Sequence, residues 1–280
     1  MRNKLENDNI KITNIHRLYG DYVEIDVAEL EKDQTKYFAE ILPEKFYDMV
    51  DGLPENEREE LLFDVLVVDE GQDVLKMEYL WTMDLLLKDG LKNGKWAIFY
   101  DGEQNLYNKE FEAGIEELQE YPSTKFVLHQ NCRNTEQIGR FAEKTSGITV
   151  GDCISGQGEE VTTIRYEGND DYRSKLISLL EELKKEGVKL SDVTILAPKK
   201  YERLNLCEAL DGVCKVNVMQ NEDYCPTEDV SFSTIQGFKG LDSKVVILTE
   251  LEGIKPENYN KFMYIAISRA RTKLYILKNI

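Results

Sequence analysis

The stretch FDVLVVDEGQD, residues 63–73, decides the fold class. Its apolar run is rich in valine and does not alternate with polar residues, which is typical of a strand buried on both faces of a parallel sheet. Asp69 and Glu70 follow the run directly, at the end of the strand where parallel α/β sheets bind their ligands. Acidic residues also end strands for solubility alone, so the pair by itself leaves both interpretations open.

Further apolar segments of the same kind follow along the chain. They are KWAIFYDGEQ (95–104), KFVLHQN (125–131), DVTILAP (192–198), KVVILTE (244–250) and KLYILKN (273–279). Helical patterns lie between them. In residues 171–188, for example, leucines recur at helical spacing and Gly187 ends the pattern. Strands that alternate with helices predict an α/β fold with parallel sheets.

The charge of the chain is unevenly distributed. Its 280 residues are enough for two domains and carry a net charge of -18. Residues 1–128 contain 14 Lys and Arg against 30 Asp and Glu, whereas residues 129–280 contain 21 against 23. This change predicts one domain at 1–128 and another at 129–280. An acidic chain does not favour nucleic acid as a partner, so any such contact must come from a local groove.

The composition also bears on location. No apolar run approaches the ~20 residues that a membrane span needs, so no membrane partner is expected. The first 15 residues lack the apolar core of a secretory signal. The five cysteines contain no CxxC pair, which argues against a zinc site or a disulfide framework and for reduced thiols. A cytoplasmic location is therefore expected.

Polar motifs occur in a fixed order at the predicted strand ends. They are DEGQD (69–73), DGEQNLY (101–107), NCRNT (131–135), TIQGFKGLD (234–242) and YIAISRAR (264–271). In order and approximate spacing they resemble the motor core of UvrD/Rep-type superfamily 1 DNA helicases, from about residue 60 to residue 280. NIHRL (14–18) also resembles an earlier DNA-contacting motif of that family. The short spacings are similar to those of compact members without a large accessory insertion.

The resemblance implies a fold, cofactors and partners. The fold would be two RecA-like lobes of the P-loop NTPase type, built on parallel sheets. ATP and Mg²⁺ would be the cofactors. Single-stranded DNA, or RNA, would be the partner on which the protein moves while it unwinds a duplex.

The resemblance also implies roles for individual residues. Asp69 would coordinate Mg²⁺, and Glu70 would be the general base for the attacking water. Gln104 would contact the γ-phosphate, and Arg133 and Arg269 would neutralise charge on the transferred phosphoryl group. The other implied contacts are with the nucleotide (Lys239, Gly240 and Asp242) and with nucleic acid (His16, Tyr107, Phe111 and Gln236).

Two of these positions depart from the family pattern. Asp242 stands where the family has glutamate near the ribose, and Gln236 stands where many relatives have histidine. Both contacts are therefore in question. Each aromatic residue can instead belong to the core, and each arginine can instead be an ion-paired surface residue.

The phosphate loop of this family, GxxxxGK[ST], does not occur in the sequence. The nearest approach is GLKNGKW (90–96), which has one residue too few between its glycines and Trp96 in place of Ser or Thr. It also precedes a strand, whereas the loop must follow one. The resemblance therefore predicts a first lobe truncated at its amino end, with the loop upstream or on a partner chain.

Three interpretations remain open. The chain is the carboxyl-terminal motor portion of a helicase, inactive alone, or a non-catalytic nucleic-acid- or protein-binding module derived from one, or an ATPase with a different phosphate loop. We favour the first, because a non-catalytic module has no physical need to keep the carboxylates, the glutamine and the arginines together. A truncated first lobe is also expected to expose an apolar edge or face.

Overall fold

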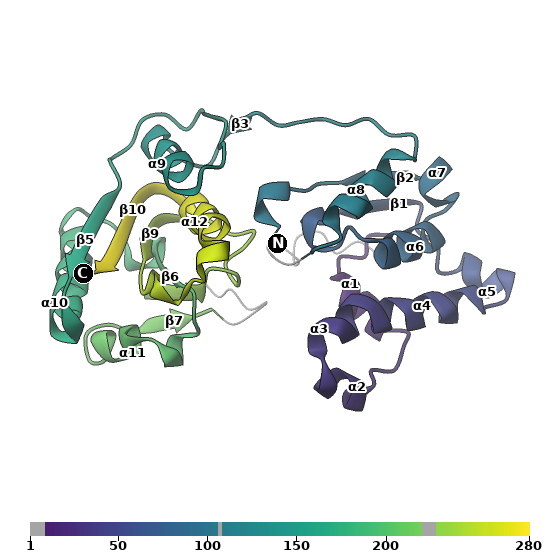
Figure 1. The fold of residues 1–280 in the computed structure, drawn as a ribbon, viewed down its shortest axis with the longest axis horizontal. Coiled ribbons are helices and arrows are strands. Elements are labelled where there is room, and N and C mark those ends of the chain that lie inside the picture. Colours follow the sequence, from purple (N-terminus) through teal and green to yellow (C-terminus); the bar gives the residue numbers. More distant parts are fainter. Residues whose placement is uncertain (1–8, 106–107, 220–227) are drawn as a thin grey trace. The chain divides into compact units, whose positions relative to one another are not determined.

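The computed structural model describes residues 9–105, 108–219 and 228–280. The chain divides into two compact units, Met1–Lys125 and Phe126–Ile280, each with its own hydrophobic core. Both units contain parallel strands accompanied by helices (Figure 1). The predicted α/β class with parallel sheets is confirmed. None of the helices in the described part of the chain is long and apolar enough to cross a membrane.

The first unit is mainly helical, around a two-stranded parallel sheet of β1 and β2. Leu66, Val68, Trp96 and Ile98 lie on one face of this sheet and pack against its core. The elements, in chain order, are α1 (Ile15–Gly20), α2 (Val27–Lys32), α3 (Gln34–Lys36), a π-helical turn (Tyr37–Ile41), α4 (Leu42–Asp51), α5 (Glu55–Glu59), β1 (Val65–Val68), α6 (Met77–Leu86), α7 (Gly90–Asn93), β2 (Lys95–Ile98) and α8 (Phe111–Gln119).

The other face of the β1–β2 sheet is exposed. Val65 is 53% exposed and Val67 64%. Phe99, directly after β2, is 57% exposed. Alternate residues of a strand point to opposite faces, so these side chains lie away from the core. The prediction that residues 63–70 form a strand buried on both faces is therefore wrong, because the described helices of this unit cover only one face.

The second unit contains a six-stranded parallel sheet with the strand order β5-β10-β9-β6-β8-β7. A separate parallel pair is formed by β3 and β4. The elements are β3 (Gln130–Asn131), α9 (Glu136–Ser146), β4 (Asp152–Cys153), β5 (Thr162–Tyr166), α10 (Gly168–Lys185), β6 (Val193–Ala197), α11 (Asn205–Leu210), β7 (Val216–Val218), β8 (Val230–Thr234), β9 (Ser243–Leu248), α12 (Tyr259–Ser268) and β10 (Ala270–Asn279).

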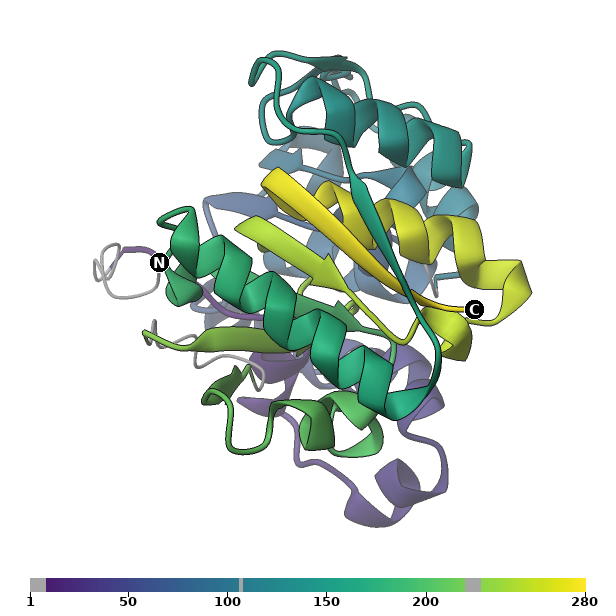
Figure 2. The same ribbon diagram turned by 90° about the vertical axis from the view of Figure 1, so that its left-hand side faces the viewer.

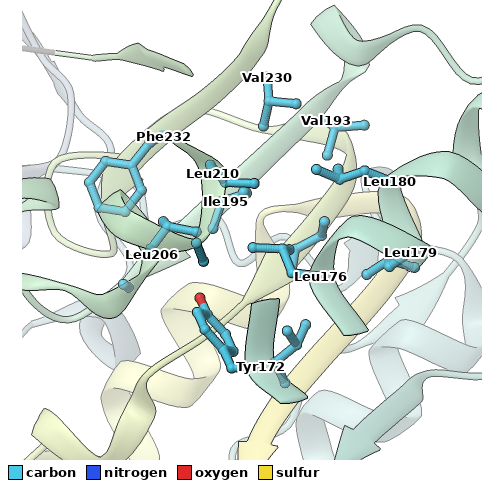
Figure 3. Packing of buried hydrophobic residues seen from close by; sticks show 14 of the residues in the cluster. Tyr172, Leu176, Leu179, Leu180, Val193, Ile195, Leu206, Leu210, Val230 and Phe232 are labelled. Carbon is cyan, nitrogen blue, oxygen red and sulfur yellow. The ribbon is translucent and has the colours of Figure 1, made fainter. Parts of the chain in front are cut away.

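Helix α10 forms where the leucine spacing predicts it, and it lies across the sheet (Figure 2). Its buried side chains, such as Leu176 and Leu180, pack against Val193 and Ile195 of β6 (Figure 3). Full burial of a leucine contributes about 1.5–3 kcal/mol, so this layer is a main source of stability. All five residues of β6 are buried, as a continuous apolar strand requires.

The predicted strand at 125–131 forms only in its last two residues, as β3. Phe126, Val127 and Leu128 are 86%, 59% and 90% exposed. An apolar segment becomes a buried strand only when another strand pairs with it, and none in the described residues pairs with 123–129. This segment, which we call the connecting segment (residues 123–129), lies at the boundary of the two units.

Candidate functional site

The turn after β1 is unusually tight. Glu70 has the left-handed conformation φ 55°, ψ 39°, which costs about 1–3 kcal/mol for a residue other than glycine and is found preferentially at functional sites. The amide of Gly71 donates to the carbonyl of Phe99 over 2.8 Å. A Cβ on Gly71 would lie 2.7 Å from Ile98 Cγ2, so only glycine lets the turn pack on the end of β2.

Gln72 connects the two strand ends. Its side chain is fully buried. Nε2 donates to Glu70 Oε2 over 2.5 Å, and Oε1 accepts from the amide of Asp101 over 2.9 Å. Asp101 Oδ2 in turn accepts from Gln104 Nε2 over 2.7 Å. Glu70 after β1 and Gln104 after β2 therefore belong to one hydrogen-bonded chain, which we call the strand-end network (Glu70, Gln72, Asp101 and Gln104).

The carboxylates at this site fit a metal–nucleotide better than a metal alone. Asp69 is exposed, and its Oδ1 accepts from the amide of Glu70 over 3.0 Å. No group of three or more His, Cys, Asp or Glu able to hold a metal occurs within the described residues. Mg²⁺ is usually held by one or two carboxylates together with waters and substrate phosphates. The pair of Asp69 and Glu70 meets that requirement.

In the second unit, the turn after β3 is joined to the α12–β10 junction. Asn131 Oδ1 accepts from the amides of Arg133 and Asn134 over 2.9 and 3.0 Å. Asn134 is 1% exposed, and its Nδ2 donates to the carbonyls of Ser268 and Ala270 over 3.0 and 2.5 Å. The two arginine motifs therefore lie side by side, although more than 130 residues separate them in the sequence.

Arg269 does not offer its guanidinium at the surface. The residue is 1% exposed, and Nε donates to the carbonyl of Ile265 over 3.1 Å. Nη1 donates to the carbonyl of Leu241 over 3.2 Å. As the structure stands, the predicted contact between Arg269 and a phosphoryl group is therefore not available. The side chain instead ties helix α12 to the loop between β8 and β9.

Arg133 is partly exposed and Arg271 exposed, unlike Arg269. Arg133 Nε lies 3.5 Å from Asp242 Oδ2, and Arg271 Nη1 lies 3.9 Å from Asp242 Oδ1. The side chains of Arg133, Asp242 and Arg271 are 36%, 39% and 55% exposed. We call these three residues the Arg133–Asp242–Arg271 cluster.

Asp242 stands at the end of the loop that follows β8. Ile235 and Phe238 are buried and anchor this loop. Lys239 lies in a turn closed by a hydrogen bond from its amide to the carbonyl of Gln236. Gly240 is exposed with φ 81°, a conformation that favours glycine. The four predicted positions Gln236, Lys239, Gly240 and Asp242 thus lie on one loop.

The predicted nucleic-acid contacts of the first unit have other neighbours. His16 Nε2 is 2.8 Å from Tyr79 Oη, and its ring centroid is 4.9 Å from that of Phe38. Burial, with a smaller effect of Lys76, lowers the pKa of His16. The prediction that Phe111 stacks on a base is wrong, because Phe111 is 4% exposed and belongs to the core. Tyr107 lies outside the described residues.

Sequence reasoning missed the residues that hold the sites together. Gln72, Asp101, Asn134 and Arg271 all stand inside the motifs that the sequence singled out. The sequence shows that these residues are polar and stand beside predicted strand ends. A polar residue type alone does not indicate whether its side chain is buried and bonded to the backbone or exposed.

The fold and the two sites define an α/β protein with polar networks at the ends of its parallel strands. No family model matches the chain. The chain is 25% identical over 241 residues to a putative ATP-dependent DNA helicase of Acanthamoeba polyphaga mimivirus. The match covers 75% of this chain and 34% of that protein, so the chain spans about a third of the relative's length.

A solved structure is also similar to part of the chain. It is the C-terminal domain of a possible DNA helicase from Lactobacillus plantarum WCFS1. The identity is 20% and the TM-score 0.44, over 52% of this chain and 86% of that one.

Proposed function

We propose that this chain is the carboxyl-terminal motor portion of an ATP-dependent DNA helicase or translocase of the UvrD/Rep type in superfamily 1. The phosphate loop is supplied by residues outside this chain, upstream or on a partner. The motor uses ATP with Mg²⁺ and moves on single-stranded DNA, or on RNA. The mimivirus relative, named as a DNA helicase, supports the helicase class.

The observation that carries the proposal is the strand-end network. Hydrolysis of a phosphoanhydride needs a carboxylate for the metal, a base for water and a donor near the transferred group. Asp69 and Glu70 follow β1, Gln104 follows β2, and buried Gln72 joins the two strand ends. When bound, Mg²⁺ supplies charge that polarises the phosphate. Asp69 would hold the metal, and Glu70, oriented by Gln72, would accept the proton of water.

The second unit contributes positive charge and loop contacts in this proposal. Arg133 contacts the transferred phosphoryl group, and the β8–β9 loop contacts the nucleotide through Lys239, Gly240 and Asp242. Arg269 acts by positioning, because its guanidinium holds that loop against α12. Gln236 and His16 stay proposed contacts to nucleic acid, as does Tyr107.

The burial of Arg269 favours a second candidate function. A module that binds nucleic acid or protein without catalysis would keep Arg269 only for its structural hydrogen bonds. It would bind its partner equally well with and without nucleotide.

The test is ATP hydrolysis, measured with and without single-stranded DNA. The tagged chain is purified alone, and it is also recovered with its bound partners from its own cells. Each preparation is made with the native residue and with Glu70→Gln. The variant keeps the shape of the side chain and removes the carboxylate that would accept the proton.

Each outcome decides between the interpretations. DNA-stimulated hydrolysis by the recovered assembly, absent from the isolated chain and lost in Glu70→Gln, is the expected result. Hydrolysis by the isolated chain, lost in the variant, would overturn the proposal that the phosphate loop lies outside it. No hydrolysis in either preparation, with DNA binding that ATP does not change, would establish the non-catalytic module.

A further inference from the structure

The Arg133–Asp242–Arg271 cluster holds more positive than negative charge. Two guanidinium groups share one carboxylate, at 3.5 and 3.9 Å. Neither distance is that of a short charge-assisted hydrogen bond, for which about 2.7–2.9 Å is typical. Partly exposed ion pairs of this kind contribute only about 0–1 kcal/mol. The carboxylate is therefore easily displaced from the arginines by a stronger anion.

The backbone holds both arginines in place. Ala270 pairs with Ser243 and Lys273 pairs with Val245, so β10 has one residue more than β9 between these pairs. Such a bulge changes the direction in which a side chain points, and bulges are frequent beside active sites. Arg271 lies in this bulge. The carbonyl of Arg271 accepts from the amide of Thr135 over 3.2 Å, which fixes it close to the turn that carries Arg133.

We propose that Arg133 and Arg271 form a phosphate-binding site in the second unit, and that Asp242 is the counter-ion that a phosphate displaces. A phosphate group has more negative charge than a carboxylate and can accept hydrogen bonds from both planar guanidinium forks. Within the proposed function, on which this inference rests, Arg271 supplies the exposed positive charge that buried Arg269 does not supply.

The phosphate can come from two sources that share this chemistry. One is the polyphosphate of a nucleoside triphosphate, and the other is the backbone of single-stranded nucleic acid. The cluster would recognise the phosphate oxygens in both cases. Competition between the two kinds of ligand identifies the source.

The experiment measures binding of sodium tripolyphosphate to the full chain by calorimetry, without magnesium and at low salt. Arg271→Gln is expected to weaken binding about tenfold or more, since it removes a charge-assisted contact. Asp242→Asn is expected to tighten binding severalfold, because it removes the competing carboxylate. Arg165→Gln, an exposed arginine on β5 outside the cluster, is the matched control and is expected to change binding less than twofold.

Arg271→Gln is expected to weaken binding and Asp242→Asn to tighten it. Tighter binding in Asp242→Asn cannot result from misfolding, since a misfolded protein would bind tripolyphosphate less tightly. Equal losses in Arg271→Gln and Arg165→Gln would overturn the proposal, as would weaker binding in Asp242→Asn. The measurement uses tripolyphosphate without magnesium and follows binding alone, so the result does not depend on whether the assembly hydrolyses ATP. Displacement by ATP assigns the site to nucleotide, and displacement by a thymidine oligonucleotide assigns it to nucleic acid.

Discussion

At the scale of single residues, buried polar groups determine how exposed ones are presented. Gln72 and Asn134 are almost fully buried, and each bonds to a residue or backbone segment of a proposed site. Polar groups of this kind are costly unless they are paired, so their partners are held in fixed positions. The geometry of Glu70 and of the arginine motifs therefore depends on side chains that no substrate would touch.

Replacement of Gln72 by leucine is expected to destabilise the first unit by about 1–3 kcal/mol, because the amide of Asp101 loses the acceptor that the buried Gln72 side chain provides. Both tryptophans of the chain, Trp81 and Trp96, lie in this unit. Their fluorescence during urea unfolding therefore reports its stability directly. Glu103→Gln, an exposed change beside the same network, is the control. An equal midpoint in both variants would contradict the role assigned to Gln72.

The stability of the first unit is expected to depend on pH through His16. Burial lowers its pKa in the folded chain, so the unfolded chain binds the proton more readily. Above the unfolded pKa of about 6.5, His16 is neutral in both states and does not reduce the free energy of unfolding. Below that pH the unfolded chain binds the proton first, so the free energy of unfolding falls as the pH decreases. Tryptophan fluorescence during urea unfolding between about pH 5.5 and 7.5 measures this slope. The slope should be smaller in His16→Gln, and an unchanged slope would contradict the assignment.

At the scale of helices and strands, the two units differ in how their strands are covered. The strands β6 and β9 lie inside a six-stranded sheet, and their apolar residues are buried. The strands β1 and β2 form a sheet of two, which leaves Val65 and Val67 exposed. The same kind of apolar run thus has different surroundings in the two units.

The junction of α9 with the α12–β10 segment is expected to depend on Asn134. Asn134→Ala removes two buried hydrogen bonds and should lower the free energy of unfolding of the second unit by about 2 kcal/mol. Thermal unfolding followed by far-ultraviolet circular dichroism measures this effect. Lys144→Ala, on the exposed surface of α9, should have little effect. A similar loss in both variants would show that the junction does not depend on Asn134.

The strands and helices of the second unit follow closely from the sequence. The continuous apolar runs at 192–198 and 244–250 became β6 and β9, and the leucine spacing of 171–188 became α10. The connecting segment has an equally apolar run but no pairing strand. Whether a run is buried depends on its neighbours in space, and a pattern of single residues does not contain that information.

The positions of the candidate residues could be predicted only in part. The order of the motifs predicted that Glu70 and Gln104 stand at strand ends, and in the structure hydrogen bonds connect these two residues through Gln72 and Asp101. The motifs did not distinguish the roles of Arg269 and Arg271, which stand two residues apart. The Arg269 side chain is buried and donates to the backbone carbonyls of Ile265 and Leu241, whereas Arg271 lies in a bulge. Both outcomes depend on backbone geometry beyond the motif.

At the scale of the whole molecule, the exposed apolar face and the acidic charge act against each other. Val65, Val67 and Phe99 form a surface that favours association of two copies. The net charge of -18 opposes it by repulsion, which salt screens. Self-association is therefore expected to increase with salt concentration.

The double change Val67→Lys and Phe99→Lys should abolish this salt-dependent association without lowering the stability of the first unit, because both side chains are already exposed. Analytical ultracentrifugation at low and high salt measures the association. Val27→Lys, a 60% exposed position on α2, is the matched control and should associate like the native chain. Loss of association in the control would show that added charge alone is responsible.

The exposed connecting segment offers a way to divide the protein into its halves. Phe126 and Leu128 are 86% and 90% exposed within an irregular stretch, and exposed irregular segments are preferred sites of proteolytic cleavage. Brief digestion with chymotrypsin, which cuts after such side chains, should therefore cleave here first. One fragment would carry nearly all of the excess negative charge and the other almost none, so anion exchange would separate them. Each unit could then be examined alone, without any redesign of the gene.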